Sequence, residues 1–354
     1  MQDGERPDEV IIERRGTAGI IRLNRPRALN SLTLPMIRAI TAALHDFARD
    51  SEVASVVAMG EGERGFCAGG DIRVLHESAR AGDGLAASFW REEFRLNHLI
   101  ASYPKPYVAL MDGITMGGGV GLSSHGRHRI VTERTRLAMP ETGIGYVPDV
   151  GATWLLPRAP GEAGTWLGLT GLDIAAADAI HARLADLQIA SSRLDEAIDA
   201  LSALPRASSS GDVDAVLQAL SEPQGESRLR QNAAVIDRAF RYDRVEEILA
   251  ALAEEEDEFA AETRRVLLTR SPTSLKLALR LFRAGRRSAS LAECLGRELG
   301  ACLQMLDNPD FFEGIRAAVI DKDRNPKWSP ASVEAVEAAR VEYFLKPAEP
   351  PLSL

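Results

Sequence analysis

The chain has 354 residues, of which 45% are hydrophobic and 26% charged, and its formal net charge is −9. This length exceeds what one hydrophobic core usually serves, so we expect two domains, or one domain with a large helical extension. The net acidity argues against nucleic acid and membrane surfaces as partners, because both are polyanions that an acidic surface repels. A small anionic ligand held by a local basic patch stays compatible with this charge.

The three cysteines, Cys67, Cys294 and Cys302, lie far from any metal-ligand spacing, which is typical of a reducing compartment without disulfides. We expect their thiols to be buried core groups. The start MQDGERPDEV is charged and lacks the apolar run of a signal peptide, and no later apolar run approaches the ~18 residues that a membrane span requires. These features predict a cytoplasmic protein.

The first half of the chain alternates short β-rich runs with helical patterns. Apolar runs on both sides of Arg14-Arg15-Gly16 predict a hairpin. Helical spacing of apolar residues over 32–50 predicts a helix, with Thr33 as its N-cap. Further β-rich runs occupy residues 53–60, 105–113 and 128–133. This alternation favours an α/β fold.

A second early helix is expected at 85–102, where it ends before Tyr103-Pro104. The preceding stretch, 77–87, is small, polar and glycine-bearing. It is compatible with a mobile flap beside a site, but an ordinary surface loop is the simpler interpretation.

The second half of the chain is predicted to be helical. From about residue 162 onward, Ala, Leu, Glu and Arg dominate and β-branched runs nearly vanish. Serine and glycine make 204–214 the best candidate for a linker. We therefore expect a core with the active site over residues 1–205 and a helical region over 206–354.

Two glycine-rich loops follow predicted strands. One, GITMGGGVGLSS, begins a predicted helix, although glycine costs a helix about 1 kcal/mol relative to alanine. Amides at such a helix N-terminus can face an anion or a developing oxyanion, but a tight turn without a ligand explains one glycine cluster equally well. The other loop, RGFCAGGDIRVL, offers a second amide. Two amides from two loops make an oxyanion hole for a thioester or ester carbonyl, in which each donor is worth about 3 kcal/mol.

The acid–base groups beside these loops are predicted to be carboxylates. No nucleophile-elbow serine is present, and the histidines show no metal pattern. Ser123 and Ser124 lie beside His125, but neighbours on a helix point in different directions, so a Ser/His pair is not favoured. Glu141 follows an apolar run, where burial would raise its pKa toward neutrality and suit it to general-base work. Alternatively, Glu141 is a first-turn helix charge and Asp149, in VPDVG, a turn residue.

Together these segments resemble the crotonase (enoyl-CoA hydratase/isomerase) superfamily, and within it the 3-hydroxyisobutyryl-CoA hydrolases most closely. The segments that carry the resemblance are LNRPRALNSL, GFCAGGDIRVL, FWREEFRLN, KPYVALMDGITMGGGVGLS, MPETGIGYVPDVG, SPTSLKLAL and FFEGIRAAVIDKDRNPKW. The resemblance implies an α/β spiral of ββα turns, followed by a helical C-terminal region, that binds an acyl-CoA thioester.

The resemblance also implies roles for individual residues. The backbone amides of Gly70 and Gly118 would form the oxyanion hole, Glu141 and Asp149 would be catalytic, and Glu93 would contact the acyl end of the substrate. Arg25 would be a further phosphate contact. The other residues that it places near CoA are Arg27, Ala28, Ala68, Asp71 and Ile72.

One position separates hydrolases from hydratases in this family. Hydratases that resemble this chain carry a first catalytic glutamate three residues after the second oxyanion-hole glycine, where this chain has Gly121. Their second glutamate matches Glu141, whereas Asp149 occurs in the hydrolases. A hydratase must protonate one carbon while it activates water at the next, so the loss of one group should cripple it. The resemblance thus implies hydrolysis of a short β-hydroxyacyl-CoA, with 3-hydroxyisobutyryl-CoA of valine breakdown as the best candidate.

Two alternatives stay open. One is an enoyl-CoA hydratase or isomerase that works with Glu141 alone, and the other is an acyl-CoA binding protein without catalysis. No metal or redox cofactor is expected, since CoA is part of the substrate. The expected partner is therefore an acyl-CoA, without nucleic acid or membrane. Homo-oligomerisation is left open, because apolar stripes can pack within the chain or between chains. Ala152, Thr153 and Trp154 replace glycines and an aromatic found in many hydrolases, which predicts a reshaped acyl pocket.

Overall fold

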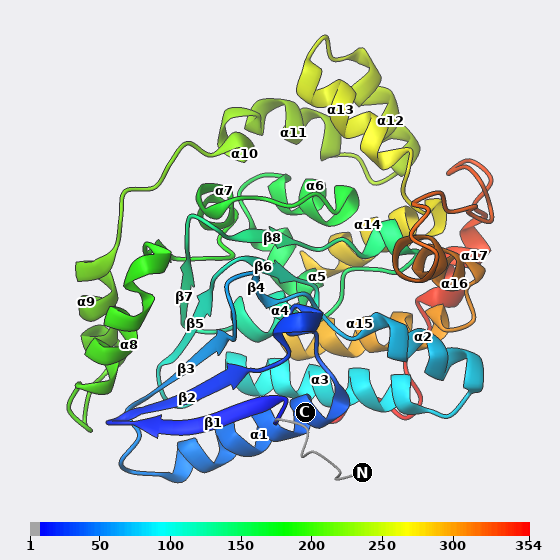
Figure 1. Cartoon of the computed structure of the whole chain (residues 1–354). Helices are drawn as coiled ribbons and strands as arrows, with labels where there is room; N and C mark the ends of the chain where they lie inside the picture. Colours follow the sequence, from blue (N-terminus) through cyan, green and yellow to red (C-terminus); the bar gives the residue numbers. More distant parts are fainter. Residues whose placement is uncertain (1–7) are drawn as a thin grey trace.

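The computed structural model describes residues 8–354, so the charged start at residues 1–7 lies outside the described part. Two β-sheets form the centre of the molecule (Figure 1). In the larger sheet, the predicted hairpin is confirmed and four further strands follow it in parallel. The strand order of this sheet is β1 (Val10–Arg15), β2 (Ala18–Leu23), β3 (Ser55–Gly60), β5 (Tyr107–Met111), β7 (His128–Val131) and β9 (Leu187–Gln188).

The smaller sheet is parallel and contains the strands that follow β3, β5 and β7 in the chain. These are β4 (Gly65–Cys67), β6 (Ile114–Met116) and β8 (Arg136–Ala138). After the hairpin, the turns that begin with β3, β5 and β7 each give one strand to each sheet and then continue into helical structure. This is the expected spiral of ββα turns, and the predicted α/β fold is confirmed.

Helices α1 (Leu34–Arg49), α3 (Leu85–Ala101) and α4 (Gly118–Ser123) belong to the spiral. The side chain of Thr33 accepts a hydrogen bond from the Met36 amide at 3.3 Å, which confirms the predicted N-cap of α1. The interpretation of 77–87 as a surface loop is wrong, because α2 (Ile72–Ala81) extends into it and only 82–84 separate α2 from α3. Buried contacts of Leu75 and His76 hold α2 against the core and override the polar composition of the stretch.

Helices α8 (Leu194–Ser202) and α9 (Ser210–Leu220) pack on the larger sheet. Their apolar side chains form a cluster with strand residues such as Ile20 and Val57. The predicted linker at 204–214 is therefore partly wrong: a capping box between Ser209 and Asp212 begins α9 inside it. The long extended connection is 221–227, which leads to the next helix (Figure 1).

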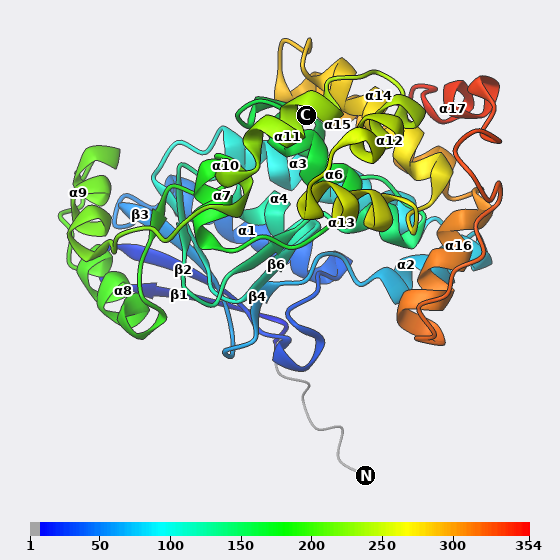
Figure 2. The same cartoon turned by 90° about the horizontal axis from the view of Figure 1, so that it is seen from above.

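Figure 2 shows α8 and α9 at one end of the molecule with α16 and α17 at the other. The remaining α-helices are α5 (Ala152–Leu155), α6 (Ala163–Thr170), α7 (Ala176–His181), α10 (Arg228–Gln231), α11 (Ala233–Phe240), α12 (Val245–Glu254), α13 (Glu258–Leu267), α14 (Pro272–Gly285), α15 (Leu291–Met305), α16 (Pro309–Ile315) and α17 (Ala338–Phe344). Short turns of other helix types are η1 (Pro26–Ala28), η2 (Glu141–Ile144), η3 (Leu156–Arg158), η4 (Ser191–Arg193) and η5 (Arg316–Ile320).

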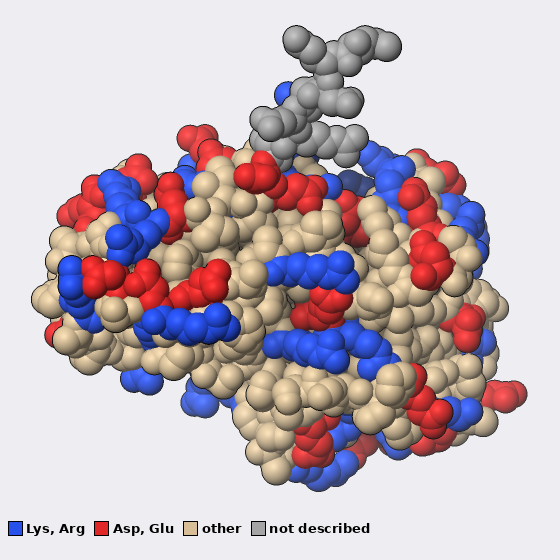
Figure 3. Space-filling view, turned by 90° about the horizontal axis from the view of Figure 1, so that it is seen from below, with Lys and Arg blue, Asp and Glu red and all other residues tan. Residues whose placement is uncertain are grey.

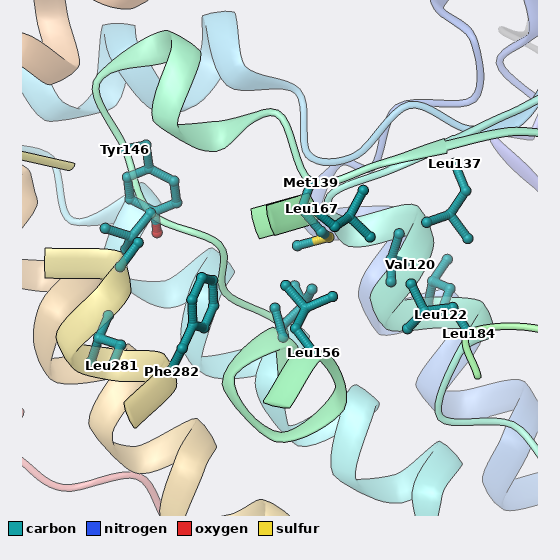
Figure 4. Packing of buried hydrophobic residues seen from close by; sticks show 14 of the residues in the cluster. Val120, Leu122, Leu137, Met139, Tyr146, Leu156, Leu167, Leu184, Leu281 and Phe282 are labelled. Carbon is teal, nitrogen blue, oxygen red and sulfur yellow. The ribbon is translucent and has the colours of Figure 1, made fainter. Parts of the chain in front are cut away.

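The helical region and the spiral share one buried cluster, which includes residues from Val10 to Ala348. Figure 4 shows part of it, where Val120 of α4, Leu137 of β8 and Phe282 of α14 belong to the same packed group. One buried cluster joins residues on both sides of position 205. The division of the chain at that residue therefore stays a prediction.

The surface and the helices bear on the expected partners. Within residues 8–354, no helix is long and apolar enough to span a bilayer. On the face in Figure 3, basic and acidic side chains are interleaved, and neither sign forms one broad patch.

Candidate active site

A cavity of about 190 Å³ lies between the two glycine loops, α3 and the segment after β8. Three carboxyl groups line it, those of Glu93, Glu141 and Asp149. Glycines of both loops form one side, and apolar or aromatic side chains form the rest. The latter are Ala68, Ile72, Leu75, Phe89, Trp90, Pro140, Ile144 and Tyr146. A larger cleft of about 680 Å³ between α14 and α15 contains none of the predicted site residues.

The two glycine loops bring backbone amides together. Gly69 (φ +99°) and Gly117 (φ +50°) adopt conformations that other residues rarely reach, and each precedes the glycine whose amide was predicted to bind an oxyanion. A Cβ atom on Gly118 would lie 3.4 Å from the Gly70 nitrogen, so the two amides are close. Among residues 8–354, neither amide donates a backbone hydrogen bond. Both are therefore free to bind a ligand oxygen.

The three carboxyl groups come from different elements. Glu93 lies on α3, Glu141 begins η2, and Asp149 lies in the loop after it. Their exposed fractions are only 2%, 6% and 5%. A Cβ on Gly117 would lie 2.9 Å from Glu141 Oε1, and one on Gly118 would overlap Glu93 Oε1, so both glutamates face the glycine turn. Within the described residues, Glu93 Oε1 and Glu141 Oε2 have no hydrogen-bond partner.

This burial shifts the titration of all three groups. Burial, followed by the charge of Asp149, raises the pKa of Glu141 well above its usual value. The pKa of Glu93 is raised by burial and then by the charges of Asp149 and Glu141. Burial raises the pKa of Asp149 to about 7, although hydrogen bonds to it oppose the shift. A buried carboxyl group whose pKa is raised in this way can give and take protons at a higher pH than an exposed one.

Two side chains that contact Asp149 were not predicted from the sequence as site residues. The Tyr146 hydroxyl donates to Asp149 Oδ2 at 3.2 Å, and the Cys302 thiol lies 3.8 Å from the same oxygen. Tyr146 also stacks on Trp90, with ring centroids 5.5 Å apart. The position of Tyr146 between the two predicted acids was the available signal. Burial of all three thiols confirms the expectation for the cysteines, but Cys302 also contacts a site residue.

The structure brings together only part of the predicted CoA-binding set. Ala68 and Ile72 line the cavity, whereas Arg27, Ala28 and Asp71 do not. Asp71 instead forms an ion pair with Arg25 at 3.0 Å, which neutralises the charge that was expected to meet phosphate. The side chain of Arg27 is exposed on η1. Contacts of Arg27, Ala28 and Asp71 with CoA therefore stay predictions.

Ser124 and His125, which were not expected to form a catalytic pair, have structural roles. Ser124 Oγ donates to the Leu184 carbonyl at 3.1 Å, and His125 Nε2 lies 2.7 Å from the Val150 carbonyl, so the two side chains do not form a catalytic pair. Within residues 8–354, no group of three or more His, Cys, Asp or Glu is arranged to hold a metal ion. Residues 152–154 lie outside the lining of the cavity, so their effect on the acyl pocket stays a prediction.

Gly121 lies in α4, with no space for a side chain. A Cβ there would lie 2.7 Å from both Asn97 Nδ2 and Val150 Cβ, closer than real Cβ atoms approach their neighbours. The position that carries a glutamate in hydratases is thus closed by packing in this chain. The carboxyls that face the cavity are those of Glu93, Glu141 and Asp149.

The ββα spiral, with paired glycine amides opposite buried carboxyls, defines a crotonase-type protein. The sequence model described as enoyl-CoA hydratase/isomerase matches residues 18–345, and the chain belongs to this family.

Relatives and solved structures cover nearly the whole chain. The 3-hydroxyisobutyryl-CoA hydrolase, mitochondrial, of Danio rerio is 42% identical over 350 residues, which are 97% of this chain and 90% of that protein. A structure titled as a carnitinyl-CoA dehydratase from Mycobacterium thermoresistibile has a TM-score of 0.92 at 40% identity and covers 98% of both chains. One titled as an enoyl-CoA hydratase from Rhodobacter sphaeroides 2.4.1 has a TM-score of 0.89 at 43% identity, over 98% of this chain and 100% of that chain.

Proposed function

We propose that this chain hydrolyses a short β-hydroxyacyl-CoA thioester, with 3-hydroxyisobutyryl-CoA converted to 3-hydroxyisobutyrate and CoA. The observation that carries the proposal is the pair Glu141 and Asp149, both buried and both facing the cavity beside two free glycine amides. The 42% identity to a protein named 3-hydroxyisobutyryl-CoA hydrolase supports the same substrate. Such a reaction belongs to valine breakdown.

The geometry supports two tasks for the site, which are to bind the thioester oxygen and to attack the carbonyl carbon. The thioester oxygen would accept hydrogen bonds from the amides of Gly70 and Gly118, which stabilise the negative charge that develops on it. Glu141 would then act in one of two ways. Either its carboxylate attacks the carbonyl carbon, CoA leaves as a thiolate that takes up a proton, and water cleaves the mixed anhydride to release the acid and regenerate Glu141. Or Glu141 takes a proton from a water molecule that attacks the carbonyl carbon directly, the C–S bond breaks, and the departing CoA thiolate takes up that proton.

The other two carboxyls would hold the reactants in place. Asp149 would orient Glu141 or the attacking water, or bind the substrate hydroxyl, and Glu93 would fix the acyl end. The reaction uses only the thioester and water, so we propose no metal or redox cofactor. Curated relatives carry "mitochondrial" in their names, and a cytoplasmic location for this chain stays a prediction.

The second candidate is hydration or isomerisation of an enoyl-CoA. The names of the two similar structures favour it, since one is called a dehydratase and the other a hydratase. The closed position at Gly121 opposes hydration, because one of the two acid–base groups is missing. Isomerisation needs one base to shuttle a proton and stays compatible with Glu141.

The test is to incubate the protein with 3-hydroxyisobutyryl-CoA and a thiol-reactive chromophore, beside Glu141→Gln and Asp149→Asn. Rapid CoA release that collapses in both variants is expected. In parallel, the conjugated absorbance of a crotonyl-type enoyl-CoA is followed. Loss of this absorbance without thiol release would indicate that the protein is a hydratase and not a hydrolase. Tight binding with the acyl-CoA recovered intact would indicate a binding protein without catalysis.

A further inference from the structure

Helix α15 carries a carboxyl group into the core beside the site. Glu298 has an exposed fraction of 0%, and it lies among the buried residues Leu295, Leu299 and Cys302 of the same helix. Residues four apart on a helix face the same side, so Glu298 and Cys302 are directed toward one neighbour. That neighbour is the loop that carries Asp149.

The carboxyl group of Glu298 binds this loop through both of its oxygens. The Gly151 amide donates to Oε2 at 2.7 Å, and the Thr153 amide donates to Oε1 at 2.8 Å. These amides belong to the first turn of α5 and its cap, directly after Asp149. Since a buried carboxylate is costly unless it is hydrogen-bonded, the pairing of both oxygens indicates a built contact.

The segment held by Glu298 has an unfavourable backbone conformation. Val150 has φ +53°, which is rare for a β-branched residue, and Gly151 has φ +84°. The Val150 carbonyl can only accept a hydrogen bond, so His125 Nε2, at 2.7 Å, donates to it. A strained turn persists only where its surroundings hold it. Glu298 and His125 hold this one from both sides.

We propose that Glu298 is a positioning residue for the hydrolysis proposed above: by accepting the Gly151 and Thr153 amides it holds the Val150–Gly151 turn and fixes the Asp149 carboxyl in the cavity. It lies outside the cavity lining and so acts on the reaction through Asp149. Cys302, one helical turn further on, adds a direct contact to Asp149 Oδ2 at 3.8 Å. The helical region thereby sets the geometry of a site formed mainly by the spiral.

The first test uses hydrogen exchange in the unmodified protein and in Glu298→Gln. The amides of Gly151 and Thr153 should be protected in the parent and exchange at least about tenfold faster in the variant, because a glutamine has only one oxygen for two donors. Amides of α1 should not change. Free exchange of both amides in the parent protein would overturn the proposal, and this part of the test does not depend on any activity.

The second test is kinetic and rests on the proposed function. In Glu298→Gln, kcat for CoA release should fall by about 10- to 100-fold while KM stays within about threefold, since a displaced catalytic group slows the reaction more than it weakens binding. Glu293→Gln, on the exposed side of the same helix, is the matched control and should keep the parental kcat. If the parent released no CoA, the proposed function would fail while the exchange test still decided whether Glu298 holds the turn.

A third variant separates positioning from packing. Glu298→Asp keeps a carboxyl group as acceptor but loses a methylene group, whereas Glu298→Gln keeps the volume. Retention of more kcat by Glu298→Asp than by Glu298→Gln supports the positioning role. If Glu298→Gln does not fold, free exchange of the Gly151 and Thr153 amides in the parent protein would still overturn the proposal. Parental kcat in a folded Glu298→Gln protein, with the turn still protected, would show that Glu298 only fills space.

Discussion

Two buried glutamates in this molecule have opposite surroundings. Glu162, at the start of α6, and Glu141, in the candidate site, have exposed fractions of 7% and 6%. Glu162 forms ion pairs with Arg283 at 3.0 Å and Arg286 at 2.7 Å. Burial alone would raise its pKa, but the hydrogen bonds from Arg286 and Thr165 and the charge of Arg283 outweigh burial and lower it. Among the described residues, Glu141 has no ion-pair partner, and its pKa is raised.

The difference shows that burial does not by itself make a carboxyl group reactive. Glu162 and its arginines link α6 to α14, so that its charge is neutralised and its role is structural. Glu141 faces two other carboxyls, Glu93 and Asp149, across a cavity. Folds leave such groups uncompensated mainly where function requires it. The comparison thus separates a structural carboxylate from a catalytic candidate by its partners.

The largest expected effect belongs to Glu141→Gln. If Glu141 is the base or nucleophile, kcat for CoA release should fall by about 10²- to 10⁴-fold, because the amide cannot accept a proton or attack. The thermal stability should be unchanged or higher, since an uncompensated buried carboxyl is removed. A loss of kcat smaller than tenfold would assign the chemistry to another group.

The reciprocal change is Glu162→Ala. It leaves the largely buried Arg283 with Asp243 as its acidic partner and should lower the free energy of unfolding by about 3 kcal/mol. Urea denaturation measures this loss, while kcat per folded molecule should stay at the parental value. A large fall in kcat with unchanged stability would break the distinction between the two glutamates.

The third prediction concerns pH. The pKa of Asp149 is raised from 3.8 to about 7, chiefly by burial. Between these values the folded protein binds more protons than the unfolded chain, so the contribution of Asp149 to stability is complete at low pH and is lost as pH rises through about 7. The difference in melting temperature between Asp149→Asn and the parent should therefore rise from about pH 4 to about pH 7 and stay constant above that range. Parallel curves for the two proteins would show that Asp149 is already ionised throughout.

The smallest effect is expected next to Glu93 on α3. Glu92 forms an exposed ion pair with Arg38 at 2.7 Å, and the hydrogen bond from Arg38 lowers the pKa of Glu92. Exposed pairs contribute little, so Arg38→Ala should leave both the melting temperature and kcat within experimental error of the parent. A clear fall in kcat would mean that this face of α3 affects the position of Glu93.

Sequence alone was sufficient for features that local chemistry determines. The hairpin before residue 24, the Thr33 cap and the end of α3 follow from turn, capping and proline preferences, and all three are confirmed. The polar composition of 77–87 predicted a surface loop, and this prediction was wrong. The buried face of α2 stabilises a helix there despite the polar composition. The start of α9 at Ser210 was missed although its capping box is a local signal.

The site was predictable only where the family resemblance supplied it. Composition and spacing left both Glu141 and Asp149 open to ordinary turn roles. The ion pair of Arg25 with Asp71 and the contacts of Glu298 with the Asp149 loop join distant parts of the chain, so no local pattern reveals them. A glutamate within the apolar stripe of α15 was the one available hint.

The packing around Gly121 limits how this protein can change its chemistry. To introduce a second glutamate at that position, the neighbours Asn97 and Val150 would have to become smaller or move, and Val150 also belongs to the turn that follows Asp149. A single substitution would therefore damage the existing active site before it created a new one. Evolution or engineering toward a hydratase must cross a low-activity intermediate, unless several coordinated replacements arise together.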